Sequence, residues 1–429
     1  MIMDSHLAVL EQRNADGPFL RPDYGGYCFD QLPGVVKNLF CANPTISTLA
    51  SKVLRKRALP RNVVLLLIDG FGYNQWLTYC NSFTFLRRMT ERGDVVPITA
   101  LFPSTTAASL TTLNSCLTPQ QHGLMEWRLF MDELEYPILT LPFTLPDSRD
   151  KADYLKKMGV DPRILFDGNT LQQQLAAHDV HCFSFLNRNY ADSAYSNLTH
   201  EGATRVAYDS GADLVVKMRQ HLKAARQRTY FYAYYDVVDA LAHKYGPHSE
   251  EYVADLSCLL HLLQTELVEK LPPQVAEETV LLVTADHGHC PIDPRKVSYL
   301  FESDEMQACL AKTSKGEPIL PWGSPRDLFL RVREDVLEET VASLSVALDG
   351  KAQVRNSQVE ADRGLFGHGC EHPQFRRRIG NVLILPLEGE AVSYYDPAMG
   401  RLSKRGMHGG MSHEEMLTQI AFANLAELK

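Results

Sequence analysis

The sequence has no long hydrophobic run. Its longest solidly apolar stretch, Val63–Ile68, is about a third of the length that a membrane-spanning helix needs. The N-terminus also lacks the basic segment followed by an apolar segment that marks a secretion signal. We therefore expect no membrane anchor and no export through a signal peptide.

Clustered cysteines and a surplus of basic residues are also missing. The nine cysteines are scattered without a Cys-x-x-Cys pair, which favours free thiols in a reducing, cytoplasmic compartment over a disulfide framework. Acidic residues outnumber Lys and Arg by 52 to 43, a net charge of −9, so no basic surface favours nucleic acid or an acidic membrane as a partner. A negatively charged substrate would need metal ions or arginines at its site.

Internal repeats and low-complexity tracts are absent as well. Hydrophobic residues make up 45%, charged residues 22% and aromatic residues 9% of the chain, a composition that excludes disordered, collagen-like and coiled-coil proteins. A length of 429 residues allows either one elaborated α/β domain or two to three ordinary domains. The oligomeric state does not follow from the sequence.

Three short apolar runs are each followed by an acidic residue and then by a helical pattern. They are Val63–Ile68 before Asp69, Tyr230–Tyr235 before Asp236, and Val280–Thr284 before Asp286. This alternation predicts an α/β fold with a doubly wound, mainly parallel sheet and helices on both faces. Because ligands bind at the carboxyl edge of such sheets, the three acidic segments indicate one polar site.

Two segments interrupt the alternation. The irregular, proline-rich range 128–192 predicts an inserted covering region, and the range 304–367, which contains a strand, a helix and a strand, predicts a small inserted α/β subdomain. We expect residues 381–386 to resume a core strand and residues 414–428 to form a closing amphipathic helix. The whole chain, 1–429, is then a single domain with two insertions.

The first half of the chain offers an acidic residue and a group of hydroxyl residues. Asp69 precedes Gly70, and an Asp-Gly pair after a strand more often forms only a turn than part of a functional site. Ser104, Thr105 and Thr106 stand between a proline and a helical pattern, where one of them could cap the helix or meet an anion at its N-terminus. A hydroxyl nucleophile needs a lowered pKa, which a divalent cation can provide.

The second half offers paired acidic and histidine residues. Asp239 and His243 lie four residues apart, which places both on one helical face within reach of one metal ion, although a surface Asp–His contact would explain the pair equally well. Asp286 and His287 are adjacent at the end of a strand, where a turn followed by glycine can aim both at a cation.

A fifth candidate segment lies near the C-terminus. His408 stands in a glycine-rich turn, His368 is a weaker competitor, and we expect His289 and His413 to lie outside the site. Seven oxygen and nitrogen donors suit two zinc-like ions that hold a phosphate between them. These donors are Asp69, Thr106, Asp239, His243, Asp286, His287 and His408.

The order of these segments resembles the alkaline phosphatase superfamily and, within it, the type I phosphodiesterase/nucleotide pyrophosphatase family. The resemblance spans residues 63–410, nearly the whole chain. Its matching stretches are Leu67–Phe71, Phe102–Thr106, Pro119–Gly123, Asp239–Pro247, Thr284–Gly288 and His408–Gly409.

The resemblance implies an alkaline-phosphatase-like catalytic domain with two zinc ions. One ion would be held by Asp239, His243 and His408, and the other by Asp69, Asp286 and His287. Thr106 aligns with the nucleophile, and its oxygen would also touch the second ion. The implied reaction is hydrolysis of a phosphodiester or phosphoanhydride bond in a small phosphate ester, through a phospho-threonine intermediate.

Two residues depart from the nucleotide-cleaving members of that family. Ala107 stands where those members carry a base-stacking Phe after the nucleophile, and Trp127 stands where they carry a phosphate-binding Asn. The ligand pattern is therefore complete, whereas the nucleotide contacts are not. The sequence also lacks the Cys/Ser-x-Pro-x-Arg motif of a sulfatase nucleophile. The candidate substrate contacts are Phe71, Tyr73, Trp127 and Arg128.

Two alternative functions remain open. A phosphomonoesterase or phosphonate hydrolase on the same core would need cationic contacts to the additional substrate charge, and Arg128 is the nearest candidate in sequence. A metal-stabilised binding protein without turnover is the third possibility. Thr106 argues against it, because a structural zinc site is closed and needs no nucleophile.

Overall fold

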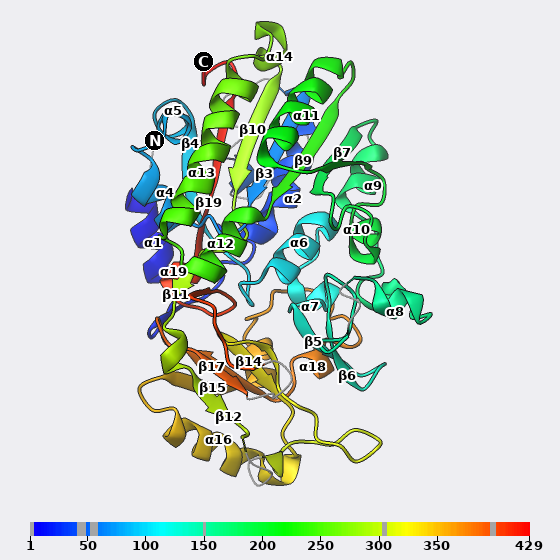
Figure 1. Ribbon diagram of the computed structural model, residues 1–429, viewed down its shortest axis with the longest axis vertical. Coiled ribbons are helices and arrows are strands. Elements are labelled where there is room, and N and C mark those ends of the chain that lie inside the picture. Colours follow the sequence, from blue (N-terminus) through cyan, green and yellow to red (C-terminus); the bar gives the residue numbers. More distant parts are fainter. Residues whose placement is uncertain (1–3, 41–48, 52–58, 149–151, 303–306, 395–399) are drawn as a thin grey trace.

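The computed structural model of the protein describes residues 4–40, 49–51, 59–148, 152–302, 307–394 and 400–429. A seven-stranded central sheet has the strand order β4–β19–β10–β3–β9–β7–β8 (Figure 1). Its strands are β3 (Asn62–Ile68), β4 (Asp94–Thr99), β7 (His181–Asn187), β8 (Thr204–Tyr208), β9 (Thr229–Tyr235), β10 (Thr279–Thr284) and β19 (Leu417–Asn424).

Six of these seven strands run in the same direction. Only β19 is antiparallel to its neighbours, β10 and β4. The central strands β3, β9 and β10 are buried along their whole length, because helices cover both faces of the sheet, and this is why they are apolar throughout rather than alternating. The predicted doubly wound, mainly parallel α/β fold is confirmed.

Helices from the connecting segments cover the sheet. Figure 1 shows α11 and α13 over one face and α2 behind the other. The helices of this part are α1 (Asp4–Asn14), α2 (Leu32–Phe40), α4 (Tyr73–Tyr79), α5 (Thr84–Arg92), α6 (Thr106–Ser115), α7 (Pro119–His122), α9 (Leu171–Ala176), α10 (Ala194–Thr199), α11 (Gly211–Ala224), α12 (Val237–Tyr245), α13 (Glu250–Leu262) with the π-helix η3 (Leu263–Val268), and α14 (Pro273–Glu277). Within the described ranges, no helix has the length and apolar character needed to cross a bilayer.

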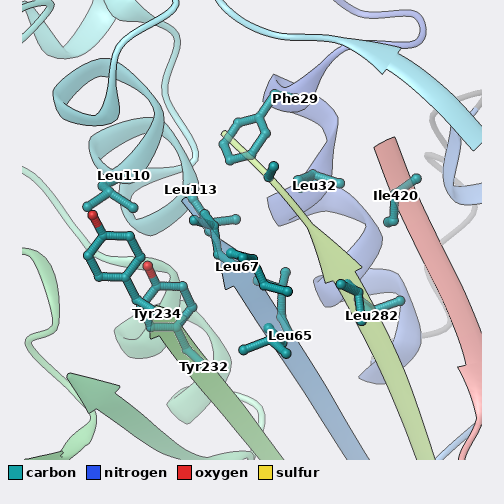
Figure 2. Close-up of a cluster of buried hydrophobic side chains, with 14 of the residues drawn as sticks. Phe29, Leu32, Leu65, Leu67, Leu110, Leu113, Tyr232, Tyr234, Leu282 and Ile420 are labelled. Atoms are coloured by element: carbon teal, nitrogen blue, oxygen red, sulfur yellow. The ribbon is translucent and has the colours of Figure 1, made fainter. Parts of the chain in front are cut away.

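The core on one face of the sheet anchors the helix that carries Thr106. Leu110 and Leu113 of α6 belong to one cluster of buried side chains with Leu67 of β3 and Tyr234 of β9 (Figure 2). Burying a leucine side chain contributes about 1.5 to 3 kcal/mol, so this cluster holds the start of α6 at the carboxyl edge of the sheet.

The range 128–192, predicted as a covering region, has two parts. It begins with the hairpin β5 (Arg128–Met131) and β6 (Tyr136–Leu139), followed by α8 (Tyr154–Lys157) and η2 (Pro162–Ile164). It then continues through α9 into β7, which pairs with β8 and β9 in the central sheet. The irregular segment is therefore shorter than its predicted bounds.

A second sheet of four strands, β13–β14–β16–β15, lies below the central one in Figure 1. Its elements are β13 (Trp322–Ser324), β14 (Asp327–Leu330), η5 (Glu334–Val336), α16 (Leu337–Ala347), β15 (Ala352–Asn356), α17 (Ser357–Asp362), α18 (Phe375–Arg378) and β16 (Val382–Pro386). The predicted core strand at 381–386 is β16, and it belongs to this small sheet, because Val382 and Ile384 pack with Leu328 and Leu330 in a separate apolar cluster. Residues 303–306, at the start of the predicted subdomain, lie outside the described residues.

The C-terminal segment differs from the predicted helix at 414–428. Only α19 (His413–Met416) is helical, and Leu417–Asn424 forms β19 between β10 and β4. The apolar spacing suits one face of a helix, but Leu417–Ala423 is buried throughout, and pairing with two neighbouring strands satisfies its backbone on both sides.

Short strand pairs connect the two sheets and the N-terminus. They are β1 (Ala15–Asp16) with β2 (Phe19–Leu20), β11 (Cys290–Pro291) with β18 (Gly406–Met407), and β12 (Ser298–Leu300) with β17 (Val392–Tyr394); the 3-10 turns η1 (Phe29–Gln31) and η4 (Pro294–Lys296) complete the elements.

Candidate active site

The predicted acidic residues meet at the carboxyl edge of the central sheet. Asp69 directly follows β3, Asp286 comes two residues after β10, and Asp239 lies in the first turn of α12, directly after β9. Because β10, β3 and β9 are parallel neighbours, their ends lie side by side. Acidic residues that are up to 217 positions apart in the chain therefore lie close together in the fold.

The three hydroxyl groups before α6 point in different directions. Ser104 Oγ donates to the carbonyl of Gly410 at 2.8 Å. Thr105 caps the helix by accepting the N–H of Ala108 at 3.3 Å, and it donates to the carbonyl of Met125 at 2.6 Å. Both hydroxyls are therefore engaged in holding the backbone.

Thr106, the first residue of α6, has its hydroxyl towards the acidic cluster. Thr106 Oγ1 lies 3.2 Å from His287 Nε2 and 3.5 Å from Asp69 Oδ2. The N-terminus of this ten-residue helix adds partial positive charge behind the hydroxyl, which favours an anion there.

Asp69, Asp286 and His287 form a buried group of possible metal ligands. His287 Nδ1 donates to the carbonyl of Gly288 at 3.0 Å, which leaves its Nε2 facing the acidic residues, 3.3 Å from both Asp69 Oδ1 and Asp286 Oδ2. Within the described residues, neither of these oxygens meets a hydrogen-bond donor. Burial and the nearby charges of Asp286 and Asp239 raise the pKa of Asp69 well above its usual range. A divalent cation would satisfy all three groups.

A second group lies beside the first. His243 Nδ1 donates to the carbonyl of Gly406 at 2.7 Å, and His408 Nδ1 donates to that of Ser104 at 2.9 Å. Their Nε2 lone pairs face each other at 3.2 Å, and each lies 3.6 Å from a carboxylate oxygen of Asp239.

The protonation of this second group suits a metal ion. Burial lowers the pKa of His243 to about 3, and burial with His287 nearby lowers the pKa of His408 well below its usual value. Both imidazoles are therefore neutral, the form that binds metals. Two facing lone pairs beside a carboxylate fit a cation between them.

His289 also belongs to this group, contrary to our expectation. Its Nε2 donates to Asp239 Oδ1 at 2.7 Å, and its side chain is fully buried. His287 and His289 are two residues apart in a segment that leads into β11, and residues at this spacing share a side in extended chain. This two-residue spacing is the feature of the sequence that could have identified His289 as a member of the site. The two groups able to hold metal ions are Asp239, His243, His289 and His408, and Asp69, Asp239 and His287.

A comparison with protein-family models matches residues 63–411 to the family described as type I phosphodiesterase/nucleotide pyrophosphatase. The chain belongs to this family. The matched range covers most of the chain and contains every member of both groups. A search of curated proteins finds no match to this phosphodiesterase-family chain.

Solved structures with a similar fold include members of two kinds. An inactive variant of murine ectonucleotide pyrophosphatase/phosphodiesterase 5, in complex with AMP, has 16% identity over 84% of this chain and 87% of its own, with a TM-score of 0.61. The human protein has the same identity and coverage and a TM-score of 0.59. Phosphonoacetate hydrolase from Sinorhizobium meliloti 1021, in complex with phosphonoacetate, has 17% identity over 85% and 90%, with a TM-score of 0.59. The similar fold agrees with the family assignment, and this member of the type I phosphodiesterase/nucleotide pyrophosphatase family is a hydrolase.

The four predicted substrate contacts have different surroundings in this phosphodiesterase-family enzyme. Phe71 and Tyr73 are buried in the core, because the chain turns inward after Gly70. Arg128 is 8% exposed and packs over the ring of Tyr394 at 4.7 Å. Of the four, only Trp127, at 48% exposed, presents a largely open side chain.

The two remaining histidines do not join either group. The ring of His368 packs edge-on to Tyr24 with centroids 6.0 Å apart, and His413 Nδ1 lies 3.2 Å from a carboxylate oxygen of Glu11. His413 was expected to lie outside the site, and His368 was the weaker competitor of His408. Neither is a member of the two groups found among the described residues.

We expect His289→Ala to weaken binding of one metal ion about ten- to a hundredfold, because Asp239 loses the donor that orients it. His289→Gln, whose amide can still donate, should retain most of the affinity. Titration of the metal-free protein with Co²⁺, followed by its visible absorption, measures this. His413→Ala is the matched control, and equal affinities of His289→Ala and His413→Ala would contradict the prediction.

Proposed function

We propose that the chain hydrolyses phosphodiester or phosphoanhydride bonds with Thr106 as the nucleophile and two zinc ions as cofactors. The observation that carries the proposal is the position of Thr106 Oγ1, at a helix N-terminus and within 3.5 Å of both Asp69 and His287. Of the three neighbouring hydroxyls, it is the one that faces the ligand groups.

The donor set supports zinc, because imidazole and carboxylate are its usual ligands. One ion would be held by Asp239, His243 and His408, and the other by Asp69, Asp286, His287 and the oxygen of Thr106. When bound, the two ions supply positive charge that polarises a phosphate and lowers the pKa of an attacking hydroxyl.

The residues of the chain supply the nucleophile and its orientation. Thr106 Oγ1 forms a bond to phosphorus as the bond to the leaving alcohol or phosphate breaks, which produces a phospho-threonine. Water then cleaves that bond and restores the hydroxyl. The N-terminus of α6 stabilises the phosphate charge in both steps, and the Thr105 cap keeps this end of the helix in place.

The solved relatives support this assignment and its nearest alternative. The murine ectonucleotide pyrophosphatase/phosphodiesterase 5 is inactive with a threonine-to-alanine substitution and holds AMP. The Sinorhizobium enzyme acts on a phosphonate. Phosphonate hydrolysis is therefore the second candidate for this chain.

We expect diesters to be preferred over monoesters. A diester carries one negative charge fewer, and Arg128, the nearest cationic candidate in sequence, is engaged with Tyr394. The measurement is kcat/KM for bis-(p-nitrophenyl) phosphate against p-nitrophenyl phosphate. A monoester advantage of about tenfold, or about 1.4 kcal/mol of transition-state preference, would indicate a phosphatase instead.

Two further substrates separate the remaining candidates. Release of inorganic phosphate from phosphonoacetate, at a kcat/KM above that of the diester, would support the phosphonate hydrolase. A panel of nucleotides should show little discrimination between bases, because Ala107 and Trp127 replace the family's stacking Phe and phosphate-binding Asn.

A further inference from the structure

The hairpin β13–β14 of the small sheet reaches the loop that carries His408. Ser324, at the tip of this hairpin, has its Oγ 3.1 Å from the carbonyl oxygen of His408. Gly409 has a φ of +124°, and a Cβ there would lie 2.5 Å from both Ser324 Oγ and Asp327 Oδ1. Hairpin and loop are therefore in direct contact beside His408.

A second contact fixes the far end of the same loop. Arg326 forms a bidentate ion pair with Glu415, at 2.9 and 2.7 Å, and both side chains are fully buried. Glu415 Oε1 also accepts the N–H of Gly410 at 3.0 Å. The hairpin tip thus holds three consecutive residues, 408 to 410, from two sides.

The side chain of Asp327 contacts Ser324. Its Oδ1 lies 2.5 Å from Ser324 Oγ and accepts the Ser324 N–H at 3.3 Å. Ser324 Oγ in turn accepts the N–H of Arg326 at 3.1 Å. These contacts fix the rotamer of the hydroxyl that faces the His408 carbonyl.

Glu126 lies against Asp327 on the other side. Glu126 follows Met125, which accepts the Thr105 hydroxyl, so this residue belongs to the segment that supports the start of α6. The side chains of Glu126 and Asp327 are 1% and 0% exposed, and within the described residues neither forms an ion pair with Lys, Arg or His.

Burial and the neighbouring Asp327 charge raise the pKa of Glu126 well above its usual range. Burial also raises the pKa of Asp327, to about 7. Burial therefore disfavours the charged form of both carboxyl groups.

We propose that Asp327 is a positioning residue for His408, acting through Ser324. The proposal rests on the assignment of His408 as a metal ligand. His408 Nδ1 is bound to the carbonyl of Ser104, so the direction of its Nε2 depends on where the 408–410 backbone lies. The small sheet is accordingly part of the scaffold of the metal site.

The test is a titration of the metal-free protein with Co²⁺, followed by visible absorption, in the parent and in variants. The parent should bind two ions. Asp327→Ala should weaken one of them at least tenfold and leave the other unchanged, and Ser324→Ala should weaken the same ion. Asp327→Asn should stay close to the parent, because its amide oxygen can still accept hydrogen bonds from the Ser324 hydroxyl and N–H.

Asp335→Asn is the control. Asp335 is an exposed carboxylate of the same subdomain, paired with Arg333, and its loss should not alter either affinity. Circular dichroism establishes that each variant is folded; if Asp327→Ala does not fold, Ser324→Ala decides, because it removes only one hydroxyl.

Two outcomes would overturn the proposal. Folded Ser324→Ala and Asp327→Ala proteins with parental affinity for both ions would show that the hairpin does not position His408. A parent that binds no Co²⁺ would remove the metal assignment on which the proposal rests.

Discussion

Thr106→Ala is expected to lower kcat by about a thousandfold or more while both metal ions remain bound. Loss of a nucleophile removes the covalent step, and comparable substitutions in hydrolases cost three to six orders of magnitude. The three other donors of the same group, Asp69, Asp286 and His287, are untouched by the substitution. Steady-state kinetics with the diester and the metal content of the purified variant measure the two effects.

The two neighbouring hydroxyls provide matched controls. Ser104→Ala and Thr105→Ala should keep most of the turnover, since both hydroxyls bind backbone carbonyls. Thr105→Ala should lower the free energy of unfolding by about 1 kcal/mol through loss of the helix cap. If Thr105→Ala were inactive and Thr106→Ala active, the nucleophile assignment would be off by one residue.

Removal of the metal ions is expected to abolish turnover, and Zn²⁺ should restore it. Without cations, the buried carboxyl groups of Asp69 and Asp286 crowd around His287, and two imidazole lone pairs of the other group face each other. The metal-free protein should therefore also be less stable. At a free zinc concentration 100 times Kd, one ion stabilises the fold by about 2.7 kcal/mol, which thermal unfolding with and without a chelator detects.

A pair of histidine variants refines the metal prediction. His408→Ala should lose one of two bound ions and most of the activity, whereas His368→Ala, in a similar glycine-rich turn that packs against Tyr24, should lose neither. Full activity in metal-free protein, or equal effects of the two substitutions, would contradict a two-metal site that includes His408.

Much of the core could be predicted because its signals are local. The runs that become β3, β9 and β10 are apolar throughout, and each is followed by an acidic residue, which identifies both a buried parallel strand and its carboxyl edge. The segment 381–386 is a strand as predicted, but it belongs to the small sheet, and the segment predicted as a closing helix forms β19. Their apolar spacing does not identify their partners, which lie far away in the chain.

The sequence by itself determined which donor types are present, their order along the chain and the family they belong to, since these depend only on residue identity and spacing. The tertiary structure alone decided where each side chain points. It turned Thr106 towards Asp69 while Ser104 and Thr105 bind backbone. It also brought His289 to Asp239, buried Phe71, and set Glu126 against Asp327. A side chain's direction follows from backbone angles and packing partners that lie far away in the chain, and spacing along the sequence does not contain them.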